Sequence, residues 1–367
     1  MNNRLARLRE KLAQEKLDGL LVTRPQNQFY LTGFSPGETY LDATLLISAE
    51  HAWVSTDSRY YEDVKRRAKD FTLFEAGYDR NKALGEFAAT AKVKTMGFEM
   101  AHLTVATLKD WSKVARKAGL KLKPTTDLVE NLRIVKEPVE LAAIRRAVKL
   151  ADDAIAHFRK VVKPGMTEKQ AAWEIEKYMR ENGADKIAFD LIVAGGPNGA
   201  LPHAIPGDHQ LQLGEPIVVD IGCRVDAYHS DLTRTLYLSN NGKVDDKFQQ
   251  VYRTVLKAQE TAERKIKAGM KGKRADAIAR DVIEKTNAEW GKTYGHGLGH
   301  GVGLAVHEGP RASKLSKDVY QSNMTLTIEP GIYLPDWGGV RIEDLVVIGE
   351  KGVEVLSQAS KDPLVSV

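Results

Sequence analysis

The stretch IVVDIGCRVDAYHSDLTRT, residues 217–235, is the part of the sequence around which the rest of the fold is organised. Its apolar run at 217–219 predicts a buried β-strand that ends at Asp220, and a second extended segment after a polar turn carries Asp231. A carboxylate at the end of a buried strand costs free energy unless a cation or a hydrogen-bond donor meets it. Two such carboxylates on the arms of one hairpin converge, so a metal ion is the simplest partner for both.

Three later stretches carry more side chains that can bind a metal, each beside glycines or an apolar strand: YGHGLGHGVGLAVHE at 294–308, TLTIEPGIY at 325–333 and VRIEDLVVI at 340–348. The side chains in question are His296, His300, His307, Glu329 and Glu343. Carboxylate and imidazole ligands without thiolates suit Mn, Co, Zn or Fe(II). Two aspartates and two glutamates are too many for one ion but enough to bridge two.

The segments VVDIG, SDLTRT, GHGLGHGVGLAVHEGPR, TIEPGIY and RIEDL resemble the pita-bread metallopeptidases, the Xaa-Pro dipeptidases (prolidases) and Xaa-Pro aminopeptidases. The resemblance covers residues 132 to about 356. It implies two divalent ions per chain (Mn, Co or Zn), with Asp231 and Glu343 bridging both. It also implies that Asp220 completes the shell of one ion, while His300 and Glu329 complete that of the other.

The same resemblance implies hydrolysis of the peptide bond before proline, with Xaa-Pro dipeptides or short peptides as substrates. Glu329 is expected to carry a proton to the leaving nitrogen, and His307 to stabilise the oxyanion. His203, 17 residues before Asp220, matches a substrate-contacting histidine. Arg311 matches the arginine that binds the free carboxylate of a dipeptide's proline. The remaining expectations are a supporting and substrate-binding role for Arg341 and a purely structural role in the loop for His296.

Several alternatives stay open at this point. An Xaa-Pro aminopeptidase acting on longer peptides fits if Arg311 does not bind a terminal carboxylate. Creatine amidinohydrolase shares the fold but replaces the metal ligands, and all five are present here. Methionine aminopeptidase shares the ligands but lacks an N-terminal domain of this kind. A catalytically silent peptide-binding module is an alternative from another class, and loss of ligands would signal it.

The length of 367 residues favours two domains, and 43% hydrophobic with 28% charged residues is typical of a globular protein. We expect an α/β N-terminal domain at 1–130 with a mostly parallel sheet, because helix-like and strand-like segments alternate there. The segments that read as strands are 19–23, 43–48, 52–56 and 94–99. An α+β pita-bread (creatinase/aminopeptidase-like) catalytic domain is expected at 131–367, including helices at 139–161, 168–182, 244–267 and 272–290. The N-terminal half resembles the family more loosely, through NQFYLTGF and TDSRYYEDV, and implies a homodimer.

The charge balance gives little support to nucleic acid or membrane partners. The net charge of +5 is a small excess of 54 basic over 49 acidic residues, without a dense basic block. A single cysteine, Cys223, excludes an internal disulfide and is expected to pack in the core. The first 22 residues predict an amphipathic helix without the apolar core of a signal peptide. We therefore expect a cytoplasmic protein.

Overall fold

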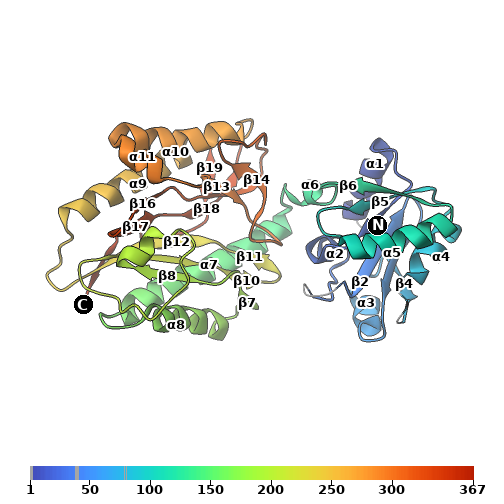
Figure 1. Cartoon of the computed structure of the whole chain (residues 1–367), viewed down its shortest axis with the longest axis horizontal. Helices are drawn as coiled ribbons and strands as arrows, with labels where there is room; N and C mark the ends of the chain where they lie inside the picture. Colours follow the sequence, from blue (N-terminus) through green and yellow to red (C-terminus); the bar gives the residue numbers. More distant parts are fainter. Residues whose placement is uncertain (1–2, 38–40, 78, 80) are drawn as a thin grey trace. The chain divides into compact units, whose positions relative to one another are not determined.

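The computed structural model describes residues 3–37, 41–77, 79 and 81–367, and the chain divides into the units Met1–Arg133 and Ile134–Val367 (Figure 1). The first unit is built on one sheet with the strand order β4-β3-β2-β1-β5-β6. Its strands are β1 (Gly19–Val22), β2 (Ala43–Ser48), β3 (Ala52–Thr56), β4 (Thr72–Glu75), β5 (Thr95–Glu99) and β6 (Lys121–Thr125). Its helices are α1 (Asn3–Gln14), α2 (Pro25–Thr32), α3 (Tyr61–Arg67), α4 (Lys82–Ala91), α5 (Val105–Lys117) and α6 (Glu130–Arg133).

This sheet is mixed: three of its five strand pairs are parallel, as expected for a mostly parallel sheet, and two are antiparallel. Strands β1–β5, β3–β4 and β5–β6 pair in parallel, but β1–β2 and β2–β3 are antiparallel. The connection between β2 and β3 spans only residues 49–51. A link this short cannot make the crossover that parallel neighbours need, so β2 and β3 form a hairpin.

The second unit contains two pairs of long helices and several small sheets. Figure 1 shows α8 and α10 on opposite sides of its strands. The helices are α7 (Pro138–Val161), α8 (Glu168–Glu181), α9 (Asp246–Lys265), α10 (Gly272–Thr286), α11 (Ala288–Thr293) and a 3-10 turn at Gly196–Ala200. The strands are β7 (Lys186–Ile187), β8 (Ile192–Gly195), β9 (Pro216–Ile221), β10 (Cys223–Val225), β11 (Tyr228–His229), β12 (Leu232–Ser239), β13 (Gly299–Gly301), β14 (Glu308–Ala312), β15 (Thr325–Ile328), β16 (Gly331–Leu334), β17 (Gly338–Arg341), β18 (Asp344–Ile348), β19 (Val353–Val355) and β20 (Leu364–Ser366).

Two hydrophobic cores hold this unit together. In one, α7 and α8 pack on strands β8, β9 and β12, and Cys223 lies within it as expected. In the other, α9 and α10 pack on β15, β16, β17 and β18. The Cys223 thiol is buried and donates to the carbonyl of Ala147, and burial raises its pKa to about 11. A thiol with so high a pKa is unreactive, which fits a packing role.

Local sequence signals explain where the helices begin. Pro138 occupies the first turn of α7, and Thr167 and Gln170 form a capping box at the start of α8. One boundary was predicted wrongly: the helix expected at 272–290 ends at Thr286. Asn287 is extended, with φ −157°, and its side chain accepts from the backbone N–H groups of Glu289 and Trp290. It therefore starts the separate helix α11. None of the helices in the described ranges is long and apolar enough to cross a membrane.

Candidate metal centre

Asp220 and Asp231 lie side by side because β9 and β12 pair antiparallel. Asp220 is opposite Thr233 in this register, and Asp231 directly precedes β12. One oxygen of Asp220, Oδ2, accepts from Arg341 Nη2 at 2.7 Å. The other, Oδ1, is buried and has no hydrogen-bond partner among the described residues. The hairpin predicted from the sequence therefore leaves a carboxylate oxygen that needs a cation.

His300, Glu329 and Glu343 come from the other half of the same unit. His300 is in the middle of β13, Glu329 follows β15, and Glu343 separates β17 from β18. Backbone hydrogen bonds fix both glutamates: Glu329 N donates to the Leu298 carbonyl at 2.9 Å, and Glu343 N donates to the Thr233 carbonyl at 3.0 Å. The second bond joins the half that carries Glu343 to the half that carries the aspartates.

The structure brings all five predicted ligands into overlapping sets in which the ligand atoms lie within 4.8 Å of one another. The sets are Asp220, Asp231 and Glu343; His300, Glu329 and Glu343; and Asp231, His300 and His307. Glu343 belongs to the first two sets, and Asp231 belongs to the first and the third. Two neighbouring positions with shared carboxylates are the arrangement that a pair of divalent ions needs.

The hydrogen bonds of His300 fix which ring nitrogen faces the carboxylates. Nδ1 lies 3.1 Å from the Gly301 carbonyl, so it carries the proton. The unprotonated Nε2 then lies 3.4 Å from Glu329 Oε1 and 3.6 Å from Asp231 Oδ2. Burial also lowers the pKa of His300 to about 3, which keeps the ring neutral. A nitrogen lone pair that faces two carboxylate oxygens is stabilised by a cation between them.

The carboxylates of the cluster are electrostatically unfavourable without such a cation. Burial is the largest cause that raises the pKa of Asp231, and the negative charge of the nearby Asp220 raises it further. Burial is also the largest cause that raises the pKa of Glu343, and the negative charge of Asp231 adds to it. For Glu329, burial outweighs the opposing charge of Arg341 and raises the pKa to about 7. These side chains, the unpaired Asp220 Oδ1 and the free Nε2 of His300 therefore fit divalent metal ions with oxygen and nitrogen ligands.

A cavity of about 700 Å³ opens beside the cluster and is lined by all five candidate ligands. His203, His307 and Arg311, for which the resemblance implied roles at the substrate, also line it. The rings of His300 and His307 lie 4.4 Å apart at an angle of 70°. His307 is exposed, whereas His300 is buried, so His307 lies where a substrate atom could reach it.

The two predicted arginines have different surroundings. Arg311 faces His300 across the β13–β14 pair, and its guanidinium has no ion-pair partner among the described residues. Arg341 is buried, and its guanidinium donates to Asp220, the Tyr333 hydroxyl, the Thr233 hydroxyl and the Pro202 carbonyl. Arg311 is therefore free to bind a ligand, whereas Arg341 orients Asp220.

His296 lines the cavity, although the sequence suggested only a loop role. Its Nδ1 lies 2.8 Å from the Gly297 carbonyl, and its Nε2 lies 2.8 Å from the Tyr333 hydroxyl. Burial lowers its pKa to about 4. The signal that could have found it is its position four residues before His300 in the same glycine-rich stretch. Asp190 also lines the cavity, and no sequence pattern indicated it.

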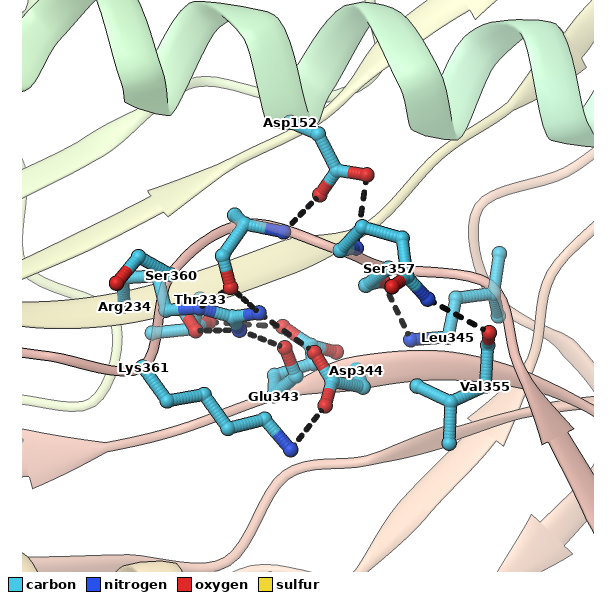
Figure 2. A network of polar contacts seen from close by, with 12 residues as sticks. Asp152, Thr233, Arg234, Glu343, Asp344, Leu345, Val355, Ser357, Ser360 and Lys361 are labelled. Atoms are coloured by element: carbon cyan, nitrogen blue, oxygen red, sulfur yellow. Dashed lines mark hydrogen bonds and ion pairs between the residues drawn. The ribbon is translucent and has the colours of Figure 1, made fainter.

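Glu343 belongs to a buried network of polar contacts (Figure 2). The Thr233 hydroxyl donates to Glu343 Oε2 at 2.7 Å, and Arg234 Nη1 donates to the Glu343 carbonyl at 2.6 Å. Arg234 also pairs with Asp344 at 2.7 Å, and Lys361 pairs with the other oxygen of Asp344 at 2.6 Å. The side chains of Arg234 and Asp344 are 1% and 0% exposed. The strand that follows Asp231 therefore holds both the backbone carbonyl and the side-chain carboxylate of Glu343.

We expect Arg234→Met to lower the free energy of unfolding by about 3–5 kcal/mol, because it removes one partner of a buried ion pair. Arg145→Met is the matched control, since the pair of Arg145 with Glu354 is solvent-exposed. Such exposed pairs contribute no more than about 1 kcal/mol. Urea denaturation of both variants in the presence of chelator measures the difference. Equal losses in the two variants would contradict a stabilising role of the network.

Comparisons with known proteins assign both units of the chain to known families. Residues 4–135 match the creatinase/prolidase N-terminal domain, and residues 142–350 match metallopeptidase family M24. The chain is 34% identical over 371 residues to an Xaa-Pro dipeptidase of Pyrococcus furiosus, covering 99% of this chain and 100% of that protein.

Two solved structures are similar over the whole length. An Xaa-Pro dipeptidase from Bacillus anthracis has a TM-score of 0.93 and 32% identity, covering 100% of this chain and 99% of the other. An X-Pro aminopeptidase from Thermotoga maritima has a TM-score of 0.88 and 33% identity, covering 99% of each chain. These matches confirm the pita-bread fold that the sequence predicted. The chain therefore belongs to metallopeptidase family M24, with a creatinase/prolidase N-terminal domain ahead of the unit that carries the carboxylate–histidine cluster.

Proposed function

We propose that this protein is an Xaa-Pro dipeptidase that uses two divalent metal ions. The observation that carries this proposal is the position of Arg311, whose unpaired guanidinium lines the same cavity as all five candidate ligands. Peptide hydrolysis is the activity of the family, and the free arginine selects the substrate length. The similarity to Xaa-Pro dipeptidases of Pyrococcus furiosus and Bacillus anthracis supports this choice.

Five side chains would hold the ions: Asp220, Asp231, His300, Glu329 and Glu343. Asp231 and Glu343 are the two carboxylates that belong to two of the overlapping ligand sets, which supports the shared position that the family resemblance implies for them. His300 also belongs to two sets, but its ring has only one nitrogen without a proton. Bound divalent ions supply Lewis acidity toward the peptide carbonyl and lower the pKa of water, which makes it a nucleophile near neutral pH. Mn, Co and Zn all suit this donor set.

The chain's own residues would perform the remaining steps. His307, exposed in the cavity beside His300, would donate a hydrogen bond to the oxyanion that forms at the carbonyl of the first residue. Glu329 would pass a proton through its carboxylate to the leaving proline nitrogen. Without this proton the nitrogen would have to leave as a strongly basic anion, so it is protonated before the C–N bond breaks. His203, which also lines the cavity, would contact the bound dipeptide.

Metal dependence and substrate length together test the proposal. Protein purified without chelator should contain two ions per chain and hydrolyse Gly-Pro-type dipeptides, and chelation should abolish this activity. Adding back Mn, Co or Zn separately identifies the metal that restores it best. A fully active, metal-free preparation would contradict the proposal. A metal-bound protein that cleaves no Xaa-Pro bond would favour a peptide-binding module.

Arg311→Ala should weaken dipeptide hydrolysis mainly through KM, by about 1.5–3 kcal/mol for a charge-assisted hydrogen bond. Xaa-Pro tripeptides should be nearly unaffected, because their proline carbonyl is part of an amide. Arg311→Lys should recover only part of the loss, since lysine keeps the charge but not the planar fork. Steady-state kinetics on both substrate lengths provide the measurement.

Lys314→Ala is the control for Arg311→Ala, because Lys314 is an exposed cation a few residues farther along the same segment. It should change neither substrate class. Equal losses on dipeptides and tripeptides in Arg311→Ala would show that Arg311 has no substrate-length role. The aminopeptidase function, which the similarity to the Thermotoga maritima X-Pro aminopeptidase supports, would then be favoured.

We also propose a cytoplasmic homodimer. The match of residues 4–135 to the creatinase/prolidase N-terminal domain supports the dimer, and the single unreactive cysteine fits a reducing compartment. Sedimentation velocity at several protein concentrations tests the assembly, and a monomer at all of them would exclude it.

A further inference from the structure

Glu168, the first residue of α8, is a fully buried carboxylate that holds three hydrogen-bond donors. Its exposed fraction is 0%. Oε1 accepts from Gly195 N at 2.9 Å and from Asn198 Nδ2 at 3.0 Å, while Oε2 accepts from Gly207 N at 2.8 Å. No lysine, arginine or histidine in the described part of the chain forms an ion pair with it. A buried charge without a counterion is stable here because of these charge-assisted hydrogen bonds and its place at a helix N-terminus.

The groups that donate to Glu168 come from the start and the end of one segment, residues 195–207, which we name the His203 loop. It starts where β8 ends and passes through the 3-10 turn before it reaches His203 at the cavity. Its middle is held separately, because Arg341 Nη1 donates to the Pro202 carbonyl at 3.3 Å. The first turn of α8 adds backbone bonds, from Glu168 N to the His209 carbonyl and from Lys169 N to the Gly207 carbonyl.

These contacts make a single carboxylate the connection between the start and the end of the loop. Oε1 of Glu168 accepts from the start of the loop and Oε2 accepts from its end, so one rigid carboxylate group links the two ends. Glu168 itself is not among the described residues that line the cavity. Its side-chain hydrogen bonds therefore reach the cavity through the loop and not by direct contact with a substrate.

We propose that Glu168 is a positioning residue that fixes the His203 loop so that His203 meets the substrate. The proposal rests on the proposed function, since it assumes that His203 contacts the dipeptide. Glutamine cannot replace this glutamate, because an amide has one acceptor oxygen and one donor group. Whichever way the amide turns, its NH2 group faces a backbone N–H at one end of the loop, and the hydrogen bond from residue 168 to that end is lost.

Glu168→Gln should therefore lower kcat/KM for Gly-Pro-type dipeptides by up to about 100-fold, as expected for displacement of a contact group by about 1 Å. Its metal content should equal that of the wild type, because the loop holds none of the five candidate ligands. Glu176→Gln is the matched control: it is the same substitution on the same helix, at a residue that pairs with Arg180 on the surface. It should behave like the wild type.

A double-mutant cycle with His203→Ala separates positioning from general destabilisation. If Glu168 acts through His203, adding Glu168→Gln to His203→Ala should lower kcat/KM by no more than about twofold. If the loss of kcat/KM in the double variant equals the product of the losses in the two single variants, Glu168 does not work through this histidine. That result would overturn the proposal. Asn198→Ala removes one of the three donors and keeps the buried carboxylate. It should produce a smaller loss in the same direction, and it replaces Glu168→Gln in the cycle if that variant does not fold.

Hydrogen–deuterium exchange tests the loop without relying on activity. Residues 195–207 should exchange faster in Glu168→Gln, or in Asn198→Ala in its place, than in the wild type and in Glu176→Gln. Residues 246–265, the helix α9, should be unchanged. Unchanged exchange in the loop would overturn the proposal whatever the kinetics show. A wild-type protein that cleaves no Xaa-Pro dipeptide would instead contradict the proposed function, while the exchange experiment would still report whether Glu168 holds the loop.

Discussion

Asp231→Asn will bind neither metal ion, and its hydrolysis of Xaa-Pro dipeptides will fall by more than about 100-fold. Changes to residues that merely support a ligand already cost 10–100-fold in metal affinity or activity, by a rough general rule. Asp231 is buried and shares ligand positions with Asp220 and Glu343 on one side and with His300 on the other. A neutral amide cannot bridge two cations, so both positions weaken together. Glu343→Gln is expected to have the same effect.

Metal analysis after dialysis against metal-free buffer measures this directly, with two ions per chain expected in the wild type and close to none in either variant. Asp226→Asn and Glu354→Gln are the matched controls, because both carboxylates pair with arginines on the surface. Thermal melting gives a second readout: metal should raise the Tm of the wild type and of the controls but not of the two variants. A variant that loses only one ion would show that its carboxylate does not bridge.

His307→Ala will lower kcat by about 10²–10³-fold while the protein keeps both metal ions, because the proposed mechanism assigns His307 as a donor to the oxyanion. His300→Ala, in contrast, will lose metal, since its unprotonated Nε2 faces Glu329 and Asp231 in the buried cluster. The two rings lie only 4.4 Å apart, so a difference in metal content between the two variants would distinguish the roles of two neighbouring histidines. Kinetics and metal content measured on the same preparations test the prediction.

The geometry also admits a competing outcome for His307. Its ligand atom lies within 4.8 Å of those of Asp231 and His300, so this histidine could itself bind a metal ion. Loss of metal from His307→Ala would assign it to the ligands and would remove it from the oxyanion. His209→Ala is the control, because His209 pairs with Glu215 and does not line the cavity within the described residues. It should change neither kcat nor metal content.

Interior strands were predictable, and edge strands were not. The sequence indicated β1, β2, β3 and β5 because their apolar runs are buried in the sheet. It missed β4 and β6, which are the two edges of that sheet. Their residues are mostly exposed, and β6 reads KLKPT. Lysine and proline are typical of edges because they prevent pairing with another chain, but they also erase the alternation that identifies a strand.

The five candidate ligands could be proposed from the sequence because the four carboxylates lie next to or within apolar strands and His300 lies in a glycine-rich stretch. A carboxylate in such a place needs a partner, and several of them along one chain indicate a common site. The family resemblance added the roles. What the segments could not give was the distance between Asp231 and Glu343, which are more than a hundred residues apart. That distance depends on β12 meeting the segment around Glu343 through the Thr233 contacts.

The sequence by itself therefore determined the fold family, the identity of the candidate ligands and the class of reaction. The tertiary structure alone decided which polar side chains support them. Glu168 reads as an ordinary acidic residue in the first turn of a helix, and Arg234 as a surface-type cation on a strand. Both are buried because distant segments, the His203 loop and the residues around Asp344, fold over them. Burial of a charge is a property of the packed chain, since it depends on which distant groups exclude water and donate hydrogen bonds.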